Sequence, residues 1–117
     1  MEGVDETKDP VTGIPTVSLY GNDEASLYPD EAFVADLDVI LFDIQDIGAR
    51  YYTYQATLGF VMEVAGRVNT RVMVLDRPNP INGVTVEGNM IGAAHRSFVG
   101  AYPLANRHGM TVAELSN

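Results

Sequence analysis

A chain of 117 residues, 46% of them hydrophobic, is the size of one domain and can bury about two thirds of its unfolded surface. Its formal net charge of −9 argues against nucleic-acid binding, which needs a basic face. The absence of cysteine excludes disulfides and thiolate metal ligands. No apolar run approaches the roughly 20 residues of a membrane span, and the acidic N-terminus lacks the features of a signal peptide.

The first half of the chain predicts a strand, a helix and a second strand. Residues 1–13 are polar and acidic and are typical of a loop, so we assign the domain itself to residues 14–117. The apolar run 14–20 predicts the first strand, and Pro29 followed by two acids is typical of a helix N-terminus. The unbroken apolar run 39–42 predicts a strand buried on both faces, as in parallel sheets covered by helices.

The second half predicts one long helix and a third strand, and then its regular pattern ends. A helical repeat of apolar residues predicts a helix from about 52 to 68, and residues 71–75 predict a strand. Residues 88–107 show no periodicity, which is typical of a functional loop. Thr111 and Glu114 have the spacing of a capping box. These elements predict an α/β fold with a parallel sheet and crossover helices, and a chain that stops within a newly begun helix indicates an incomplete domain.

Polar residues follow two of the predicted strands directly after each strand ends. In open α/β sheets, ligands bind in the crevice beyond the carboxyl ends of the strands. We therefore expect a ligand-facing cluster there, formed by Asp43, Gln45, Asp46, Arg50, Asp76, Arg77 and Asn79. Turn formation or helix capping is the structural alternative for any single one of them.

The basic residues are almost all arginines, and they are concentrated in the second half of the chain. Residues 47–117 contain four acids and all six arginines, whereas residues 1–46 contain twelve acids and Lys8. The guanidinium group presents a fixed fork to carboxylate or phosphate, so this usage indicates anion recognition. We expect at least two arginines to converge on one cleft, although internal ion pairs with Asp43 or Asp76 explain any single arginine equally well.

Several motifs resemble those of one bacterial family, in the same order along the chain. They are F-D-I-Q-D-I-G-A-R-Y-Y-T-Y at 42–54, V-L-D-R-P-N-P-I-N-G at 74–83, V-E-G at 86–88, R-S-F-V-G at 96–100, Y-P-L at 102–104 and R-H-G-M-T-V-A-E-L at 107–115. From about Gly13 onward the chain is similar to the exo-β-N-acetylmuramidase family, whose members remove N-acetylmuramic acid from the non-reducing ends of peptidoglycan fragments. The resemblance implies a Rossmann-like domain that carries a cleft and needs no cofactor or metal, joined in longer members to a smaller domain.

The resemblance implies a site for glycoside hydrolysis, which usually needs two carboxylates beside the bond that is cleaved. The candidates for catalysis are Asp43, Asp46 and Glu87. The candidates for holding the saccharide, including the lactyl carboxylate of muramic acid, are Gln45, Arg50, Tyr51, Asp76, Arg77, Asn79, Arg96, Arg107 and His108. The alternative roles are packing for two of the tyrosines at 51, 52 and 54, and a bond to a backbone carbonyl for His108.

The family's essential glutamate is expected in an upstream Gly-Pro-Glu-His-Gly segment, and no glutamate of this chain precedes His-Gly. We therefore expect a glycosidase fragment that binds peptidoglycan-derived muramic-acid saccharides without hydrolysing them by itself. The alternative is a non-catalytic α/β module that binds an anionic sugar or a partner chain. Uncovered strand ends predict self-association or a missing polypeptide partner, and full-length relatives are expected to be exported, to the periplasm or the cell exterior.

Overall fold

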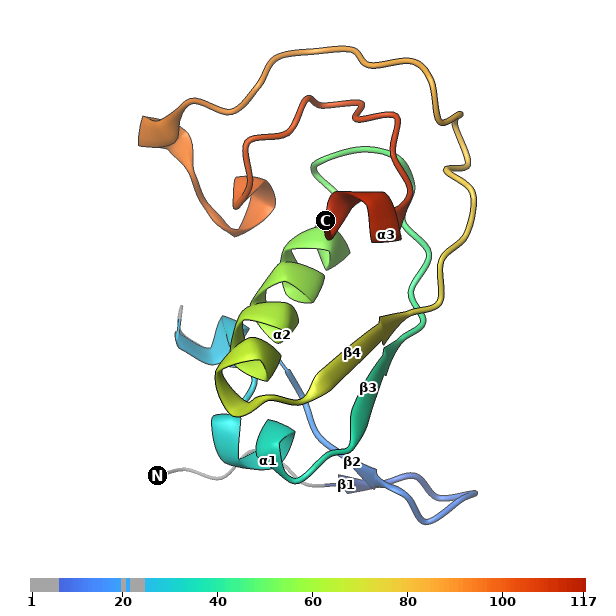
Figure 1. Ribbon diagram of the computed structural model, residues 1–117, viewed down its shortest axis with the longest axis vertical. Helices are drawn as coiled ribbons and strands as arrows, with labels where there is room; N and C mark the ends of the chain where they lie inside the picture. Colours follow the sequence, from blue (N-terminus) through green and yellow to red (C-terminus); the bar gives the residue numbers. More distant parts are fainter. Residues whose placement is uncertain (1–6, 20, 22–24) are drawn as a thin grey trace.

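A strand–helix–strand unit lies at the centre of the molecule (Figure 1). The computed structural model describes residues 7–19, 21 and 25–117. Within it, β3 (Val39–Phe42), α2 (Tyr54–Val68) and β4 (Arg71–Val74) follow one another along the chain. β3 and β4 pair in parallel over their whole length. The prediction of a parallel sheet with a crossover helix is confirmed for these two strands.

The remaining described elements are short. They are β1 (Thr7–Lys8), β2 (Pro15–Thr16), α1 (Glu31–Ala35), α3 (Val112–Leu115) and the 3-10 helices η1 (Ala25–Leu27), η2 (Ala93–His95) and η3 (Phe98–Gly100). None of the helices in the described part of the chain is long and apolar enough to cross a membrane.

The hydrophobic core lies between α2 and one face of the sheet. Leu58 and Val61 are buried along the stripe that the helical repeat predicts. At one end of α2, Leu58 packs with Phe42 of β3 and Val112 of α3. At the other end, Val34 of α1 packs against the last turns of α2. The two short helices therefore close the core at its two ends.

The first predicted strand, 14–20, does not join the parallel sheet. Of the described residues in this run, β2 alone is a strand, and it pairs antiparallel with β1; Tyr20 lies outside the described residues. The Asp9 side chain accepts hydrogen bonds from the backbone of the turn between the two strands. A local hairpin thus replaces the predicted βαβ connection, and the predicted loop 1–13 contains β1.

The sheet is covered by α2 on one face, and the prediction that β3 is buried on both faces is wrong for this structure. Val39 and Leu41 of β3 are 42% and 58% exposed, and Met73 of β4 is 55% exposed. Exposure alternates along both strands, as expected when one face of a sheet is packed. The other face is therefore an apolar surface.

The helix ends follow the predicted capping residues. Asp30 accepts hydrogen bonds from two backbone N–H groups at the start of α1. Thr111 and Glu114 form a complete capping box at the start of α3, which confirms that prediction. The long helix begins at Tyr54, two residues later than predicted, and ends at Val68, with Asn69 as its C-terminal cap at a left-handed φ of 60°.

Residues 75–110, here called the arch, pass over the C-terminal edge of β3 and β4 (Figure 1). All of them lie within the described residues, and they contain neither an α-helix nor a strand. Isolated bridges join Arg107 of the arch to Ala49 and to Glu87. The prediction that residues 88–107 lack regular structure is confirmed apart from two 3-10 turns, and the arch lies where ligands bind in open α/β sheets.

Candidate functional site

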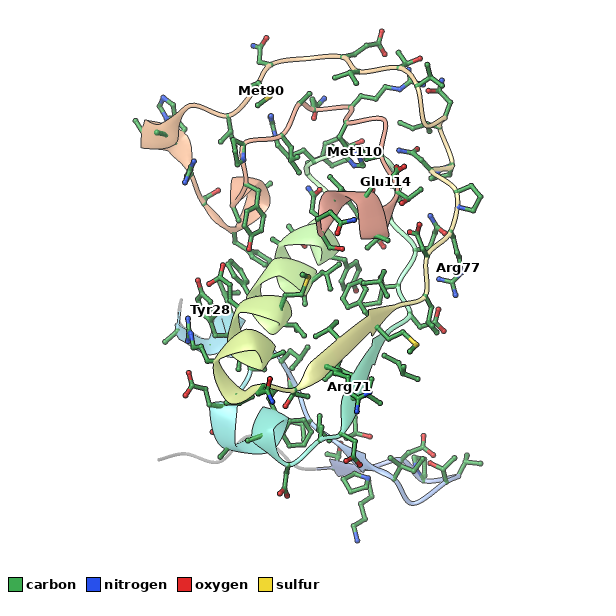
Figure 2. The ribbon with its side chains drawn as sticks, viewed as in Figure 1. Tyr28, Arg71, Arg77, Met90, Met110 and Glu114 are labelled. Carbon is green, nitrogen blue, oxygen red and sulfur yellow. The ribbon has the colours of Figure 1, made fainter. Side chains whose placement is uncertain are left out.

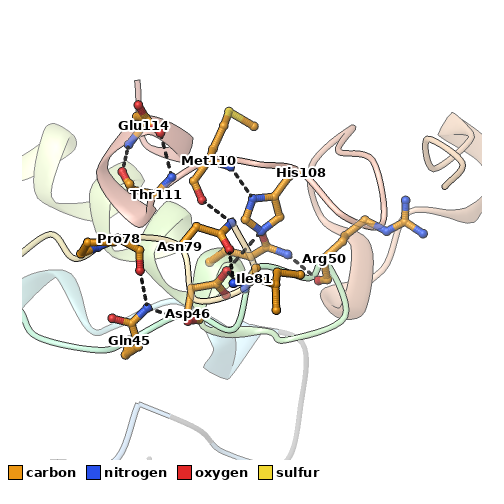
Figure 3. Close-up of polar contacts among 12 residues, drawn as sticks. Gln45, Asp46, Arg50, Pro78, Asn79, Ile81, His108, Met110, Thr111 and Glu114 are labelled. Carbon is orange, nitrogen blue, oxygen red and sulfur yellow. Dashed lines mark hydrogen bonds and ion pairs between the residues drawn. The ribbon is translucent and has the colours of Figure 1, made fainter. Parts of the chain in front are cut away.

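The segments that follow β3 and β4 meet residues from the end of the arch at the C-terminal edge of the sheet (Figure 3). Gly48, with a φ of +83°, lies at the crossing. A Cβ at this position would overlap with the Asn79 side chain and lie 2.6 Å from Cγ1 of Ile81. Both the backbone conformation and the close approach therefore require glycine.

An exposed polar rim lies at this edge and consists of Asp43, Gln45 and Arg77. Nη2 of Arg77 donates to Oδ1 of Asp43, and the two side chains are 45% and 55% exposed. Nε2 of Gln45 donates to the backbone oxygen of Asp46 at 2.7 Å and reaches that of Pro78 at 3.5 Å. An ion pair with Asp43, which the sequence left open as the alternative role of an arginine, is thus present for Arg77, and all three rim side chains are exposed.

A buried pair, Asp46 and His108, lies next to the rim. Nε2 of His108 is 3.1 Å from Oδ2 of Asp46, and the side chains are 1% and 5% exposed, respectively. The same carboxylate oxygen accepts the backbone N–H of Gly48 at 2.7 Å. On the other side of the imidazole, Nδ1 accepts the backbone N–H of Met110 at 3.3 Å. This burial leaves little of the Asp46 carboxylate accessible to a saccharide.

Sequence reasoning named both members of this pair but missed their contact. They are 62 residues apart, and His108 was expected to bond a hydroxyl or a backbone carbonyl. The available signal was a nearby glycine in each case: Gly48 lies two residues after Asp46 and Gly109 directly follows His108, and both glycines have positive φ. Such glycines mark places where the backbone turns tightly or approaches another segment closely.

Arg50 binds the arch rather than the rim. Its Nη1 donates to the backbone oxygens of Asn89 and Leu104 at 2.6 and 2.7 Å. Its backbone N–H also donates to the oxygen of Asn106 at 2.8 Å. One guanidinium therefore holds two parts of the arch that are distant in sequence, so the contacts of Arg50 are structural.

Arg107 and Glu87 form a second polar cluster. They exchange two backbone hydrogen bonds of 2.9 and 3.0 Å, and Nη1 of Arg107 lies 2.7 Å from a carboxylate oxygen of Glu87. Nη2 of Arg107 also donates to the backbone oxygen of Ile81. Of the candidate arginines, Arg77 contacts Asp43, whereas the contacts of Arg50 and Arg107 lie elsewhere; Arg96 is exposed beside η2. These contacts do not show the expected convergence.

Asp76 and Asn79 mainly support their own surroundings. Oδ1 of Asp76 accepts the backbone N–H of Ala113 at 3.0 Å. This bond, followed by one from the Thr111 side chain, holds the pKa of Asp76 below its usual value. Asn79 donates to the backbone oxygen of Met110 at 3.0 Å. The capping alternative thus describes Asp76 better than a rim position does.

The tyrosines after the rim divide as the packing alternative predicts. Tyr52 and Tyr54 lie edge to face, with ring centroids 5.1 Å apart. Tyr51 is 59% exposed and is therefore available to contact a ligand.

The described residues contain no group of three or more His, Cys, Asp or Glu side chains that could hold a metal ion.

A cavity of about 510 Å³ lies between α2, α3 and residues 102–104 of the arch. Its lining is largely apolar and includes Leu58, Met62 and Leu104. At its edge the Tyr102 hydroxyl donates to Oε1 of Glu63 at 3.2 Å. Burial, followed by the nearby Glu63 charge, raises the pKa of Tyr102 to about 12. The polar residues that the sequence predicts for ligand binding lie at the rim, so we place the candidate site there and not in this cavity.

Comparison with known proteins agrees with the resemblance found in the sequence. Residues 1–117 match a family model described as exo-β-N-acetylmuramidase NamZ, N-terminal. The chain is 43% identical over 109 residues to the peptidoglycan β-N-acetylmuramidase NamZ of Bacillus subtilis strain 168, covering 93% of this chain and 26% of that protein.

Two crystal structures of DUF1343 family proteins from Bacteroides fragilis have the same fold over this region. Their TM-scores are 0.86 and 0.81, their sequence identities are 42% and 37%, and the match covers 93% of this chain and 28% of each of theirs. The chain thus spans about a quarter of the length of these relatives. Because the family model matches its full length, this chain belongs to the NamZ N-terminal family, DUF1343.

Proposed function

We propose that this chain supplies part of the saccharide-binding cleft of a peptidoglycan-directed exo-β-N-acetylmuramidase. The family match supports this proposal, as does the activity in the name of the Bacillus subtilis relative. Because the chain spans 26% of that relative, the proposal concerns binding of the saccharide rather than a complete catalytic set.

The exposed rim is the observation that carries the proposal. Arg77 meets Asp43 through a single nitrogen, and a guanidinium has five N–H donors. It can therefore hold a second carboxylate while it keeps the first. The lactyl carboxylate distinguishes muramic acid from N-acetylglucosamine, so we assign Arg77 to that group, with Gln45 and Asp43 bonding the hydroxyls and the amide of the sugar.

Of the three candidate acids, Asp43 is best placed to touch the saccharide. Asp46 is buried against His108. Asp43 and Glu87 are both exposed and both ion-paired, but Asp43 lies at the rim beside Gln45 and Arg77, whereas Glu87 pairs with Arg107 in the second polar cluster. Glycoside hydrolysis needs a second carboxylate across the scissile bond. We therefore propose that Asp43 binds substrate and that this chain does not hydrolyse glycosides without the glutamate expected upstream.

Titration calorimetry with N-acetylmuramic acid and N-acetylglucosamine tests the assignment of Arg77. A charge-assisted bond should make the muramic acid bind about tenfold tighter or more. Arg77→Ala should abolish this preference while leaving the affinity for N-acetylglucosamine nearly unchanged. Arg71→Ala is the matched control, because it removes the same charge at the opposite end of β4 (Figure 2).

Equal affinity of the unmodified chain for the two sugars would contradict the proposal that the rim recognises the carboxylate. A loss of preference in Arg71→Ala as large as in Arg77→Ala would mean that net charge, and not the rim, sets it. This is the expected behaviour of a surface whose attraction is purely long-range.

A further inference from the structure

The hydrogen bonds around the buried Asp46–His108 pair define which ring nitrogen of His108 carries the proton. The backbone N–H of Met110 can only donate a hydrogen bond, so Nδ1 of His108 must accept it and carry no proton. A neutral imidazole has one donor and one acceptor, which puts the proton on Nε2, facing Oδ2 of Asp46 at 3.1 Å. Both side chains are more than nine-tenths buried, so water does not compete for these bonds.

A doubly protonated imidazole would not fit the same contacts. It would point a proton from Nδ1 at the donating N–H of Met110, and one of the two groups would have to move. The carboxylate of Asp46 already receives the N–H of Gly48 on the same oxygen. The bond from Met110 fixes the ring within its own segment, and Nε2 links that segment to Asp46, so His108 joins its own segment to the segment after β3 in a single arrangement of donors and acceptors.

Hydrogen bonds connect the segments of the pair to the exposed rim. The backbone oxygen of Asp46 receives the side-chain amide of Gln45, which also reaches Pro78, the neighbour of Arg77. From the other side of the ring, the oxygen of Met110 receives the side-chain amide of Asn79. The segments that bear Gln45 and Arg77 are thus both held against the buried pair (Figure 3).

We propose that His108 is a positioning residue, which as the Nε2-protonated tautomer holds Asp46 and thereby sets the geometry of the rim groups Gln45 and Arg77. The consequence for saccharide affinity rests on the proposed function. The tautomer and the order of the rim do not rest on it. The two proposals can therefore fail separately.

Nitrogen-15 NMR of the imidazole rings in the intact chain tests the first part. His108 should show a protonated Nε2, an unprotonated Nδ1 and an Nε2 proton that exchanges slowly with solvent. His95, the other histidine, is exposed and serves as an internal reference with rapid exchange. A proton on Nδ1 of His108, or exchange as fast as that of His95, would overturn the proposal.

Two conservative variants separate the two bonds of the ring. His108→Gln keeps a donor near the Nε2 position, whereas His108→Asn keeps an acceptor near the Nδ1 position and does not reach Asp46. We expect His108→Gln to keep the side-chain amide signal of Gln45 and the preference for muramic acid. We expect His108→Asn to broaden or shift that signal and to weaken muramic-acid binding about tenfold or more.

A merely structural histidine would give equal effects in both variants, and that result would refute the positioning role. His95→Asn is the control and should change neither the Gln45 signal nor the affinity. If the unmodified chain binds neither sugar, the proposed function fails, while the imidazole and Gln45 signals still decide whether His108 positions the rim. If His108→Asn does not fold, the spectra of the unmodified chain and of His108→Gln decide it.

Discussion

The strand–helix–strand unit and the arch lie side by side, yet different forces hold them. In the unit, apolar side chains of α2 and the covered face of the sheet are buried together. In the arch, Val84, Val86 and Met90 are 88%, 62% and 60% exposed. The arch packs on α2 through Phe98 and Tyr102, whose rings lie near Phe60. Elsewhere it is held by polar groups that bond its backbone, above all Arg50 and Arg107.

The difference shows how a loop with few buried apolar side chains can still have a defined shape. A backbone oxygen that receives a guanidinium N–H is fixed in direction as well as distance, because such charge-assisted bonds are the strong ones. Burial of apolar area is non-directional and suits the unit, where only close packing is required. The candidate site lies where this region meets the segment after β3, since Arg77 belongs to the arch and Gln45 reaches the arch at Pro78.

The largest expected effect belongs to the core of the unit. Leu58 is 2% exposed, so Leu58→Ala should lower the free energy of unfolding by about 2–5 kcal/mol, measured by urea denaturation. Leu41, on the uncovered face, is 58% exposed, and Leu41→Ala should change it by about 0.5 kcal/mol or less. Similar losses in both variants would mean that the uncovered face is buried in solution against another copy of the chain.

Loss of an anchor should loosen the arch alone. Arg50→Gln removes the bonds to the oxygens of Asn89 and Leu104, and bonds to charged groups contribute about 1.5–3 kcal/mol. Hydrogen exchange in residues 89–104 should therefore accelerate by about tenfold or more, while α2 keeps its protection. Arg67→Gln, on the exposed side of α2, is the control. Equal acceleration in α2 would show that the two regions unfold as one unit.

Two glycines of α2 distinguish a helix position with open space around it from one that contacts the arch. A Cβ at Gly66 meets nothing within 4 Å, whereas one at Gly59 overlaps with the Tyr102 ring of the arch. Gly66→Ala should raise the free energy of unfolding by about 0.5–1 kcal/mol, because alanine is the better helix former. Gly59→Ala should lower it by about 1–3 kcal/mol through overpacking. Thermal unfolding measures both, and stabilisation by both alanines would mean that Tyr102 does not pack on α2.

The last expected effect is a loss of folding stability at alkaline pH. The folded state raises the pKa of Tyr102 to about 12, while the unfolded chain has a tyrosine pKa of about 10. The resulting stabilisation is complete below pH 10 and is lost as the pH rises toward 12, because the unfolded state releases its proton first. A difference titration of tyrosinate absorbance against Tyr102→Phe measures the pKa, and Glu63→Gln should lower it. A titration near 10 would contradict the burial of Tyr102 and its contact with Glu63.

The unit was predictable from the sequence and the arch was not. Apolar runs and a helical repeat predicted β3, β4 and α2, and capping patterns located the starts of α1 and α3. An ion pair of Asp43 with an arginine was one of the alternatives that the sequence left open, and Arg77 is its partner because the two residues follow neighbouring parallel strands. The prediction for the run 14–20 was wrong because an apolar pattern does not specify the strand with which it pairs. Part of this run, β2, pairs with β1 in a local hairpin instead of joining the parallel sheet. No periodicity relates Asp46 to His108 or Arg50 to Leu104.

The long separation between Asp46 and His108 also has a kinetic consequence. Their contact closes a loop of 62 residues, and the Arg50 bonds close loops of 39 and 54 residues. Closing such loops costs chain entropy before any contact is gained, so proteins rich in distant contacts fold more slowly. Refolding should therefore form the strand–helix–strand unit first, and the candidate site should be the last part of this chain to assemble and the first to open.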